Sequence, residues 1–243
     1  MAKKDHRRIA SGVYWADQVA STQDVVVAAD TDFAHGDVFA TDNQTAGRGR
    51  LDRHWDTPAG TAAAMSLVLR PNLEPQLLGM LTLVVADALV RWFRELGVDA
   101  GVKWPNDVLG ADGRKLCGIL AQWLPQTNTV VVGIGTNLEF GETRAVDTAA
   151  ALADYGVTLA AQDFVKTARQ QVMDAVEEFV ADPMAQRVEP TMLTIGQRVK
   201  AILPDGKDVV GTAIGLGRTG SLLIQDEAVH EVFAADIVHL RPA

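Results

Sequence analysis

The length and composition of the chain fit a folded protein with a sizeable core. It has 243 residues, of which 48% are hydrophobic and 22% charged, so fibrous, collagen-like and low-complexity classes are excluded. The 22 Lys and Arg residues against 31 Asp and Glu residues give a net charge of −9, which disfavours a general nucleic-acid binder.

The cysteine content and the lengths of the apolar segments indicate in which cellular compartment the protein is expected. A single cysteine, Cys117, forms no internal disulfide and no multi-cysteine metal site, which is typical of a reducing cytoplasm. The basic start, residues 1–10, leads into no apolar segment. The longest apolar stretch, residues 77–90, contains Asp87 and is shorter than the roughly 20 residues of a membrane span. We therefore expect a cytoplasmic protein that is neither secreted nor embedded in a membrane.

The first part of the chain predicts a mixed sheet backed by helices, an α+β fold. In chain order we expect strands over 12–19, 38–40 and 62–69, helices over 21–32 and 76–96, and strands over 102–109, 116–124 and 129–134. We expect Arg7 and Arg8 to belong to a solvated terminus. Residues 43–58 carry no apolar pattern and predict an exposed loop, and loops of about that length are usually functional or mobile.

The second part of the chain changes character near Pro190. An Ala-rich helical stretch follows Asn137, and residues 162–180 predict a helix with one apolar stripe. Five short β-rich runs then predict a small barrel; they cover 197–203, 209–214, 221–224, 229–233 and 237–240. We expect two domains, residues 1–190 and residues 191–243.

Residues 215–220 match the dinucleotide-binding pattern G-x-G-x-x-G by their letters. That motif requires the loop to open a helix inside a βαβ unit, whereas here a predicted strand follows it. We interpret it as a glycine-rich turn of the barrel. The patterns of P-loop enzymes, zinc proteases and α/β-hydrolases do not occur in the sequence.

The loop at residues 44–50, Gln-Thr-Ala-Gly-Arg-Gly-Arg, has the composition of an anion clamp. Glycines let the backbone approach an anion while the guanidinium groups of Arg48 and Arg50 converge on it, which suits a carboxylate or a phosphate. Trp55, just beyond, is expected to be exposed and offers a face on which a planar ring can stack. The alternative is a solvated arginine turn beside a core tryptophan.

Three further segments combine strand ends with polar side chains. Lys103-Trp104-Pro105-Asn106-Asp107 lies at a strand break that Pro105 imposes. Its cation and carboxylate suit a polyphosphate with Mg²⁺, or else form a surface ion pair in a turn. Lys115 begins an apolar strand and either reaches into a pocket or extends to solvent. Residues 133–137 end a buried strand in small residues and an amide that can bond an adenine edge.

Together, in this order and spacing, these segments closely resemble the biotin protein ligases. The resemblance rests on Ser21, Thr22, Gln23, Gln44, Gly47, Arg48, Gly49, Arg50, Trp55, Lys103, Trp104, Pro105, Asn106, Asp107, Arg114, Lys115, Gly118, Ile119, Leu120, Gly133, Gly135 and Asn137. The small C-terminal barrel also resembles the SH3-like domain of that family, and the large domain its catalytic domain, which is similar to class II aminoacyl-tRNA synthetases. Gln23, residues 51–54 and Leu216-Gly217 depart from the usual family pattern.

The resemblance implies a two-step acyl transfer through an adenylate. The carboxylate of biotin attacks the α-phosphate of ATP, and the ε-amine of a lysine on a biotin carboxyl carrier protein then attacks the mixed anhydride. Such a reaction requires no enzyme nucleophile, so catalysis consists of alignment and charge neutralisation in a site closed to water. The implied small molecules are biotin, ATP and Mg²⁺, with no zinc and no redox cofactor.

The resemblance also implies a role for each matched residue. The expected biotin site consists of Ser21, Thr22, Gln23, Gln44, Gly47, Arg48, Gly49, Arg50, Lys115 and Gly118. The expected ATP site consists of Arg50, Trp55, Lys103, Asn106, Asp107 and Asn137, with Asp107 also near Mg²⁺. Arg48 and Lys115 are the expected catalytic residues, because they would flank the carboxylate and the α-phosphate. We interpret Cys117 as inert packing.

Rival functions and partners are weighed against the same residues. The rivals are a lipoate or octanoyl transferase on a related fold, a non-catalytic module that responds to biotin, and a nucleic-acid role for the barrel. Because Ser21 lies only twenty residues from the start, we expect no DNA-reading domain and no DNA partner. No membrane partner is expected, and a homodimer through a sheet edge is implied by resemblance alone.

Overall fold

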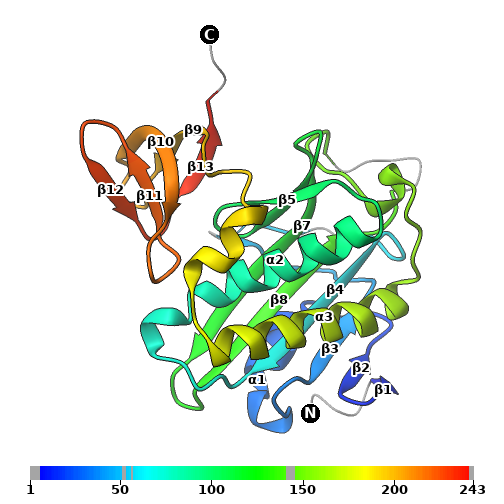
Figure 1. Cartoon of the computed structure of the whole chain (residues 1–243). Coiled ribbons are helices and arrows are strands. Elements are labelled where there is room, and N and C mark those ends of the chain that lie inside the picture. Colours follow the sequence, from blue (N-terminus) through cyan, green and yellow to red (C-terminus); the bar gives the residue numbers. More distant parts are fainter. Residues whose placement is uncertain (1–5, 51–52, 56, 141–145, 241–243) are drawn as a thin grey trace.

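The computed structural model describes residues 6–50, 53–55, 57–140 and 146–240 (Figure 1). Within them lie an eight-stranded sheet of order β1-β2-β3-β4-β8-β7-β6-β5 and a five-stranded sheet of order β12-β11-β10-β9-β13. The strands of the large sheet are β1 (Arg7–Ala10), β2 (Val13–Trp15), β3 (Val38–Thr41), β4 (Ala62–Leu69), β5 (Ala100–Lys103), β6 (Asp107–Gly110), β7 (Lys115–Leu124) and β8 (Thr129–Asn137). The β2-β3 pair is parallel and its other pairs are antiparallel, so the sheet is mixed.

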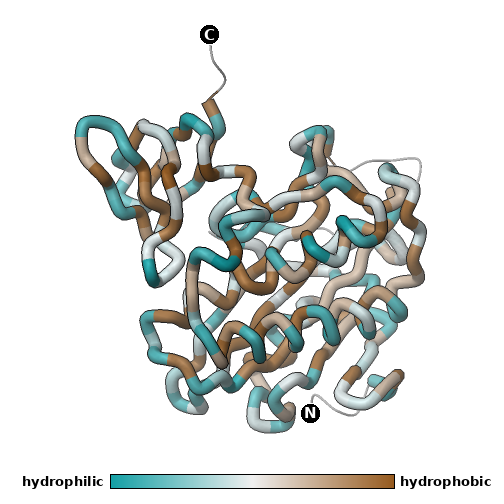
Figure 2. Tube along the Cα trace, in the orientation of Figure 1, coloured by the Kyte–Doolittle hydropathy of each residue, from teal (hydrophilic) through white to brown (hydrophobic). Residues whose placement is uncertain are grey.

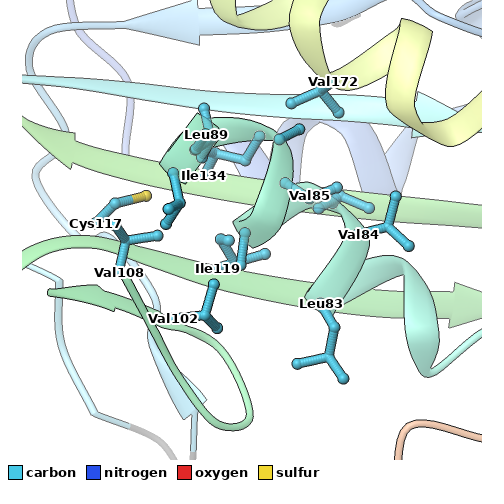
Figure 3. Close-up of a cluster of buried hydrophobic side chains, with 14 of the residues drawn as sticks. Leu83, Val84, Val85, Leu89, Val102, Val108, Cys117, Ile119, Ile134 and Val172 are labelled. Carbon is cyan, nitrogen blue, oxygen red and sulfur yellow. The ribbon is translucent and has the colours of Figure 1, made fainter. Parts of the chain in front are cut away.

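Two long helices, α2 (Met80–Glu95) and α3 (Ala161–Ala181), cover one face of the large sheet (Figure 1). Successive strand residues point to opposite faces. Strand residues on the face covered by α2 and α3 form the main hydrophobic core together with these helices. The chain is strongly hydrophobic where the helices meet the sheet (Figure 2). Cys117 lies among the buried side chains between α2 and the sheet (Figure 3). No helix in the described ranges is long and apolar enough to cross a membrane.

The short helix α1 (Thr22–Ala28) packs on the opposite face of the large sheet. Its Val26 contacts a second, smaller cluster that includes Val68 of β4 and Val131 of β8. Those two strand residues alternate with neighbours that face α2 and α3. Residues of β4, β7 and β8 beside α1 are therefore free to form a site on this less covered face.

The C-terminal sheet packs against the turn between β5 and β6. Its strands are β9 (Arg198–Ile202), β10 (Asp208–Leu216), β11 (Leu222–Gln225), β12 (Val229–Val232) and β13 (Asp236–His239), all paired antiparallel. The turn residue Trp104 is 2% exposed, and its indole Nε1 donates to the carbonyl of Gly220 at 2.9 Å. The backbone N–H of Trp104 donates to Thr194 Oγ1 at 3.0 Å. One turn of the large sheet is thereby fixed to the C-terminal sheet.

Most of the predicted elements are present, and the α+β class is confirmed. The strand at 62–69, the helix at 162–180 and the five C-terminal runs all correspond to observed elements. The glycine-rich residues 215–220 end β10 and turn into β11, so they open no helix. The division at residue 190 stays a prediction; the 3₁₀ turns Ala185–Thr191 occupy that region.

Two expectations about elements held in part and two were wrong. The strand expected over 102–109 breaks at Pro105, as predicted, into two strands joined by a turn, because Pro105, after a cis peptide bond, cannot donate to a ladder. Arg7 and Arg8 are exposed, as expected for solvated residues, but they lie in β1 and pair with β2. The predicted helix 21–32 ends at Ala28, after which a separate 3₁₀ turn forms. Part of the Ala-rich stretch after Asn137 lies outside the described residues, and the rest holds only the 3₁₀ turn Leu152–Tyr155.

Candidate active site

A pocket opens on the face of the large sheet that α2 and α3 leave free. Strands β4, β7 and β8 are neighbours in the sheet and present their smallest side chains there. In the strand register, Gly135 pairs with both Ala64 and Gly118, and Gly133 pairs with both Ser66 and Leu120. Apart from Leu120, these two adjacent rows hold only glycine, alanine and serine, so the glycines provide space for a ligand on the sheet surface.

The closed end of the pocket is a neutral, hydrogen-bonded group that we term the polar floor. It consists of Ser21, Thr22, Gln23, Gln44 and Ser66. The Gln44 side-chain carbonyl accepts from the Thr22 backbone N–H at 2.8 Å and from the Thr22 hydroxyl at 3.1 Å. Ser66 Oγ lies 2.9 Å from Thr22 Oγ1 and 3.1 Å from Gln23 Oε1. Because α1, β4 and the loop supply these groups together, their positions are set before any ligand arrives.

The start of α1 explains why the chain places this floor here. Ser21 is the N-cap residue in extended conformation, and its hydroxyl accepts from Asp24 N–H at 3.4 Å. Gln23 reaches across to the sheet and donates from Nε2 to the carbonyl of Val131 at 3.1 Å. A Cβ added to Gly133 would lie 2.8 Å from Gln23 Oε1. Glycine at this position therefore makes room for the glutamine.

The open end of the pocket carries three cations, Arg48, Arg50 and Lys115, which we term the charged rim. Arg48 Nε lies 3.0 Å from Asp24 Oδ1, and Lys115 Nζ lies 2.6 Å from Asp107 Oδ1. Arg50 Nη1 donates to Asn106 Oδ1 at 3.1 Å. The Arg48 and Asp24 side chains are 60% and 43% exposed, so water screens their attraction and the pair is weak. The rim cations can exchange these partners for a stronger anion.

Backbone hydrogen bonds within the loop hold Arg48 and Arg50 at the pocket. The Trp55 N–H donates to the carbonyl of Gly47 at 3.0 Å, and the Gly49 N–H donates to the carbonyl of Arg53 at 2.7 Å. A Cβ at Gly47 would meet the Trp55 carbonyl oxygen at 2.3 Å. Only glycine allows the chain at residue 47 to approach the chain at Trp55 so closely. In this loop conformation both Arg48 and Arg50 line the pocket.

The indole of Trp55 lies over the glycine row of the sheet. A Cβ on Gly135 would be 2.5 Å from Trp55 Nε1, and one on Gly118 would be 3.1 Å from Trp55 Cζ3. Lys115 Nζ stands 5.4 Å from the centre of the indole, within cation–π range. Within the described residues, Trp55 Nε1 is buried without a hydrogen-bond acceptor. The ring is half-buried, so the expectation of an exposed tryptophan was wrong.

A second hollow, which we term the cationic cleft, continues from the rim toward the C-terminal sheet. Five of its lining side chains are basic: Arg50, Arg53, His54, Lys103 and Lys115. Asp107 and Asp236 also line it, and Arg53 forms an ion pair with Asp236 of β13. The excess of basic groups suits a polyanion.

Two asparagines of the predicted ATP site are bound to the protein itself. Asn137 Nδ2 donates to the carbonyls of Lys115 and Ala150, at 3.2 and 3.0 Å. Asn106 Nδ2 donates to the carbonyl of Ile119 at 2.9 Å while its Oδ1 accepts from Arg50. Both amides hold neighbouring chain segments in place, and a role for Asn137 at an adenine edge stays a prediction.

The structure brings most of the predicted site residues to one pocket. Ser21, Thr22, Gln23, Gln44, Arg48, Gly49, Arg50, Trp55, Asn106, Lys115 and Gly118 line it. Lys103 and Asp107 line the cationic cleft instead, while Gly47 and Asn137 line neither hollow. The sequence analysis missed Ser66, although its position as the one hydroxyl in the apolar strand β4 was a signal.

Cys117 takes no part in the chemistry of the pocket. It is fully buried, and that burial raises the pKa of its thiol to about 12. A thiol that stays protonated is a poor nucleophile and a poor metal ligand. Elsewhere in the described chain, no group of three His, Cys, Asp or Glu residues is arranged to hold a metal ion.

The family follows from the sequence comparison, which agrees with this site. Residues 15–138, which contain the pocket residues, match the model of the biotin/lipoate A/B protein ligase family. Residues 194–240 match the biotin protein ligase C-terminal domain. The chain belongs to the biotin/lipoate A/B protein ligase family.

Within that family, the chain is similar to several named biotin ligases. The chain is 35% identical to the biotin–[acetyl-CoA-carboxylase] ligase of Mycobacterium tuberculosis over 217 residues, covering 85% of this chain and 80% of the relative. It is 31% identical to the bifunctional ligase/repressor BirA of Bacillus subtilis, covering 91% of this chain and 72% of the relative. A solved biotin protein ligase from Aquifex aeolicus, in complex with biotin and ATP, superposes with a TM-score of 0.77 at 26% identity, covering 95% and 99% of the two chains.

Proposed function

We propose that this chain is a biotin protein ligase, which activates biotin with ATP and transfers it to a lysine of a carboxylase subunit. One observation carries the proposal: a single pocket joins a neutral polar floor to a rim of three cations. The biotin head is a neutral urea, with two N–H donors and a carbonyl acceptor, whereas the other end of biotin is a carboxylate. The relatives named as biotin–[acetyl-CoA-carboxylase] ligases support the same reaction.

In the first step, a carboxylate oxygen of biotin attacks the α-phosphorus of ATP, and the bond to the leaving pyrophosphate breaks. Two anions must meet for this attack. We propose that Arg48 and Lys115 flank them, offset their repulsion and stabilise the added negative charge of the transition state. The ion pairs of these residues with Asp24 and Asp107 keep both cations at the rim until the substrates replace the aspartates.

In the second step, the neutral amine of the acceptor lysine attacks the carbonyl carbon of biotinyl-5′-AMP. The bond from that carbon to the phosphate oxygen breaks, AMP leaves with the electron pair, and the amine loses its proton. No side chain of the enzyme forms a covalent bond. Arg50 and Trp55 would hold the adenylate and exclude water from the mixed anhydride.

The cationic cleft is the proposed place for the β- and γ-phosphates. Lys103 and Lys115 supply charge there, and Asp107 supplies one carboxylate beside them. A single carboxylate fits Mg²⁺ that arrives bound to the phosphates, because Mg²⁺ usually keeps one or two protein carboxylates and completes its shell with phosphate oxygens and water. Bound there, the ion would neutralise the pyrophosphate as it leaves.

The polar floor favours biotin over lipoate as the acid. Thr22 and Gln44 present hydroxyl and amide groups at the closed end of the pocket. A urea can form further hydrogen bonds with such groups, whereas the apolar dithiolane of lipoate offers none and would only remove water from their remaining donor and acceptor positions. We therefore propose biotin as the acid.

The test is incubation with biotin, MgATP and an isolated biotin carrier domain, followed by intact mass measurement of the carrier. We expect one biotinyl group per carrier, dependent on both small molecules and absent when the acceptor lysine is replaced by arginine. Modification with lipoate but not biotin would identify the rival transferase. Biotin binding without biotin-dependent ATP–pyrophosphate exchange would identify a non-catalytic module.

A further inference from the structure

A groove beside the pocket has a different character from the cationic cleft. It has a volume of about 260 Å³ and lies between the start of α2, the turn after β5, strand β7 and the C-terminal sheet. Its apolar lining is formed by Leu83, Trp104, Pro105, Leu120, Phe233 and Ala234. We term it the apolar groove.

The apolar groove adjoins the pocket. Arg50, Asn106, Ile119 and Leu120 line both hollows, and of these Arg50 belongs to the charged rim and none belongs to the polar floor, so the groove lies beside the rim. The activated carbonyl of a bound adenylate belongs at that rim. An attacking group that entered by the groove would meet it directly.

The apolar groove and the cationic cleft both lie beside the charged rim, and they differ in charge. Among the described lining residues of the apolar groove, Arg50 is the one charged side chain. The cationic cleft holds five basic side chains and suits a triphosphate. An acceptor lysine has the opposite needs. In solution its side chain is mostly an ammonium ion, which the basic side chains of the cleft would repel as it enters. Its four methylenes gain from an apolar lining.

The outer edge of the groove carries an exposed aromatic side chain. Phe233, in the bend after β12, is 69% exposed and lines the groove. Thr219 also lines it, and within the described chain its hydroxyl is buried without a hydrogen-bond partner. Aromatic side chains at the edge of a pocket are common anchors of protein interfaces.

We propose that the acceptor lysine reaches the adenylate through the apolar groove, while the surface of the carrier domain around that lysine packs on Phe233. This inference rests on the proposed function. It assigns the two hollows to different substrates, the cleft to the polyphosphate and the groove to the acceptor. Phe233 and Thr219 of the C-terminal sheet then determine acceptor binding, without contact with biotin or ATP.

The experiment compares Phe233→Ser and Thr219→Val with Val229→Ser, a matched control. Val229 lies on β12 of the same sheet, is 55% exposed and does not line the groove. Two rates are measured for each variant: biotin-dependent ATP–pyrophosphate exchange, and transfer to the carrier domain over a range of carrier concentrations. A third assay captures the adenylate with hydroxylamine, which is too small to need docking.

We expect Phe233→Ser to raise the KM for the carrier about tenfold, as for an interface anchor, with exchange and hydroxylamine capture unchanged. Thr219→Val should raise the same KM severalfold, and Val229→Ser should leave it unchanged. An equal KM for the wild type and both groove variants would overturn the proposal, as would a parallel loss of exchange. Absence of biotin-dependent exchange in the wild type would instead refute the proposed function.

Discussion

The polar floor and the charged rim are two ends of one pocket, yet they are held in place differently. Floor residues Thr22 and Ser66 are 3% and 0% exposed and are bonded to each other. The rim cations stand on a loop and a strand edge, and Arg48 remains 60% exposed in its ion pair. The floor is thus organised without a ligand, whereas the rim must exchange its present partners when substrates bind.

This difference separates binding from catalysis. A preformed floor contacts the ground state and the transition state of biotin alike, so changes there should alter KM. The rim meets charge that increases during the reaction, so changes there should alter kcat. Substitutions at the two ends are therefore expected to fall into different kinetic classes.

The largest effect is expected at the rim, from Lys115→Met. This change keeps a flexible chain of similar length and removes the ammonium group. We expect kcat for biotin-dependent exchange to fall by about 10²–10³, as for the loss of one preorganised charge donor. Initial-rate kinetics check it, with biotin binding by calorimetry as a control of folding. A kcat within threefold of the wild type would show that Lys115 is not catalytic.

A smaller effect is expected at the floor, from Thr22→Val. The substitution keeps the shape and removes the hydroxyl that lies 3.1 Å from Gln44 Oε1. We expect the KM for biotin to rise about tenfold to hundredfold with kcat almost unchanged, because the lost bond serves both states equally. If kcat fell while KM stayed constant, the distinction between floor and rim would be incorrect.

An effect on retention rather than on rate is expected from Arg50→Gly. Arg50 belongs to the charged rim and donates from Nη1 to Asn106 Oδ1 at 3.1 Å. Its loss should release biotinyl-5′-AMP several times faster and increase labelling of lysines on bystander proteins, since the anhydride is then less enclosed. Release is measured by chromatography of the filtrate, and bystander labelling by avidin blot with serum albumin. Unchanged release would argue against a clamping role.

The smallest effect concerns the contact between the two sheets. Burial, and then the charge of Lys103, lower the pKa of His239, whose Nε2 lies 3.3 Å from Thr194 Oγ1. A lowered folded-state pKa means that the unfolded chain binds the proton more tightly. The contribution of neutral His239 to the free energy of unfolding is therefore fully present above pH 6.5 and decreases as the pH falls below that value. His239→Gln should flatten the melting temperature between pH 7.5 and pH 5.5. An equal fall in melting temperature in the wild type and the variant would show that His239 does not cause the pH dependence.

Local patterns in the sequence predict the fold and much of the site. The strand β4 is an apolar run with a single serine, and the pattern of glycines and arginines at residues 47–50 predicts an anion site at the place where the structure has its rim. Ser66 was missed because a single hydroxyl in an apolar strand is ordinarily a packing detail. Its significance depends on pairing with Gly133 in the register of β4 and β8, which no local pattern contains.

Pairings between distant segments are a second kind of information that the sequence does not reveal. The bond from Arg50 to Asn106 spans 56 positions, and the bond from Trp104 to Gly220 spans 116. Both depend on how the sheets pack, which is decided by the whole core. The sequence therefore predicts which residues carry the chemistry, while the structure shows which of them can cooperate.

The most direct measurement is a crystal structure of this chain with biotin and a non-hydrolysable ATP analogue. The account predicts that Arg48 leaves Asp24 and that Lys115 leaves Asp107, so that both cations contact the biotin carboxylate and the α-phosphate. It also predicts the urea on the polar floor and the outer phosphates in the cationic cleft. Full occupancy of both ligands, with the two original ion pairs intact and the cations away from the carboxylate, would contradict the account.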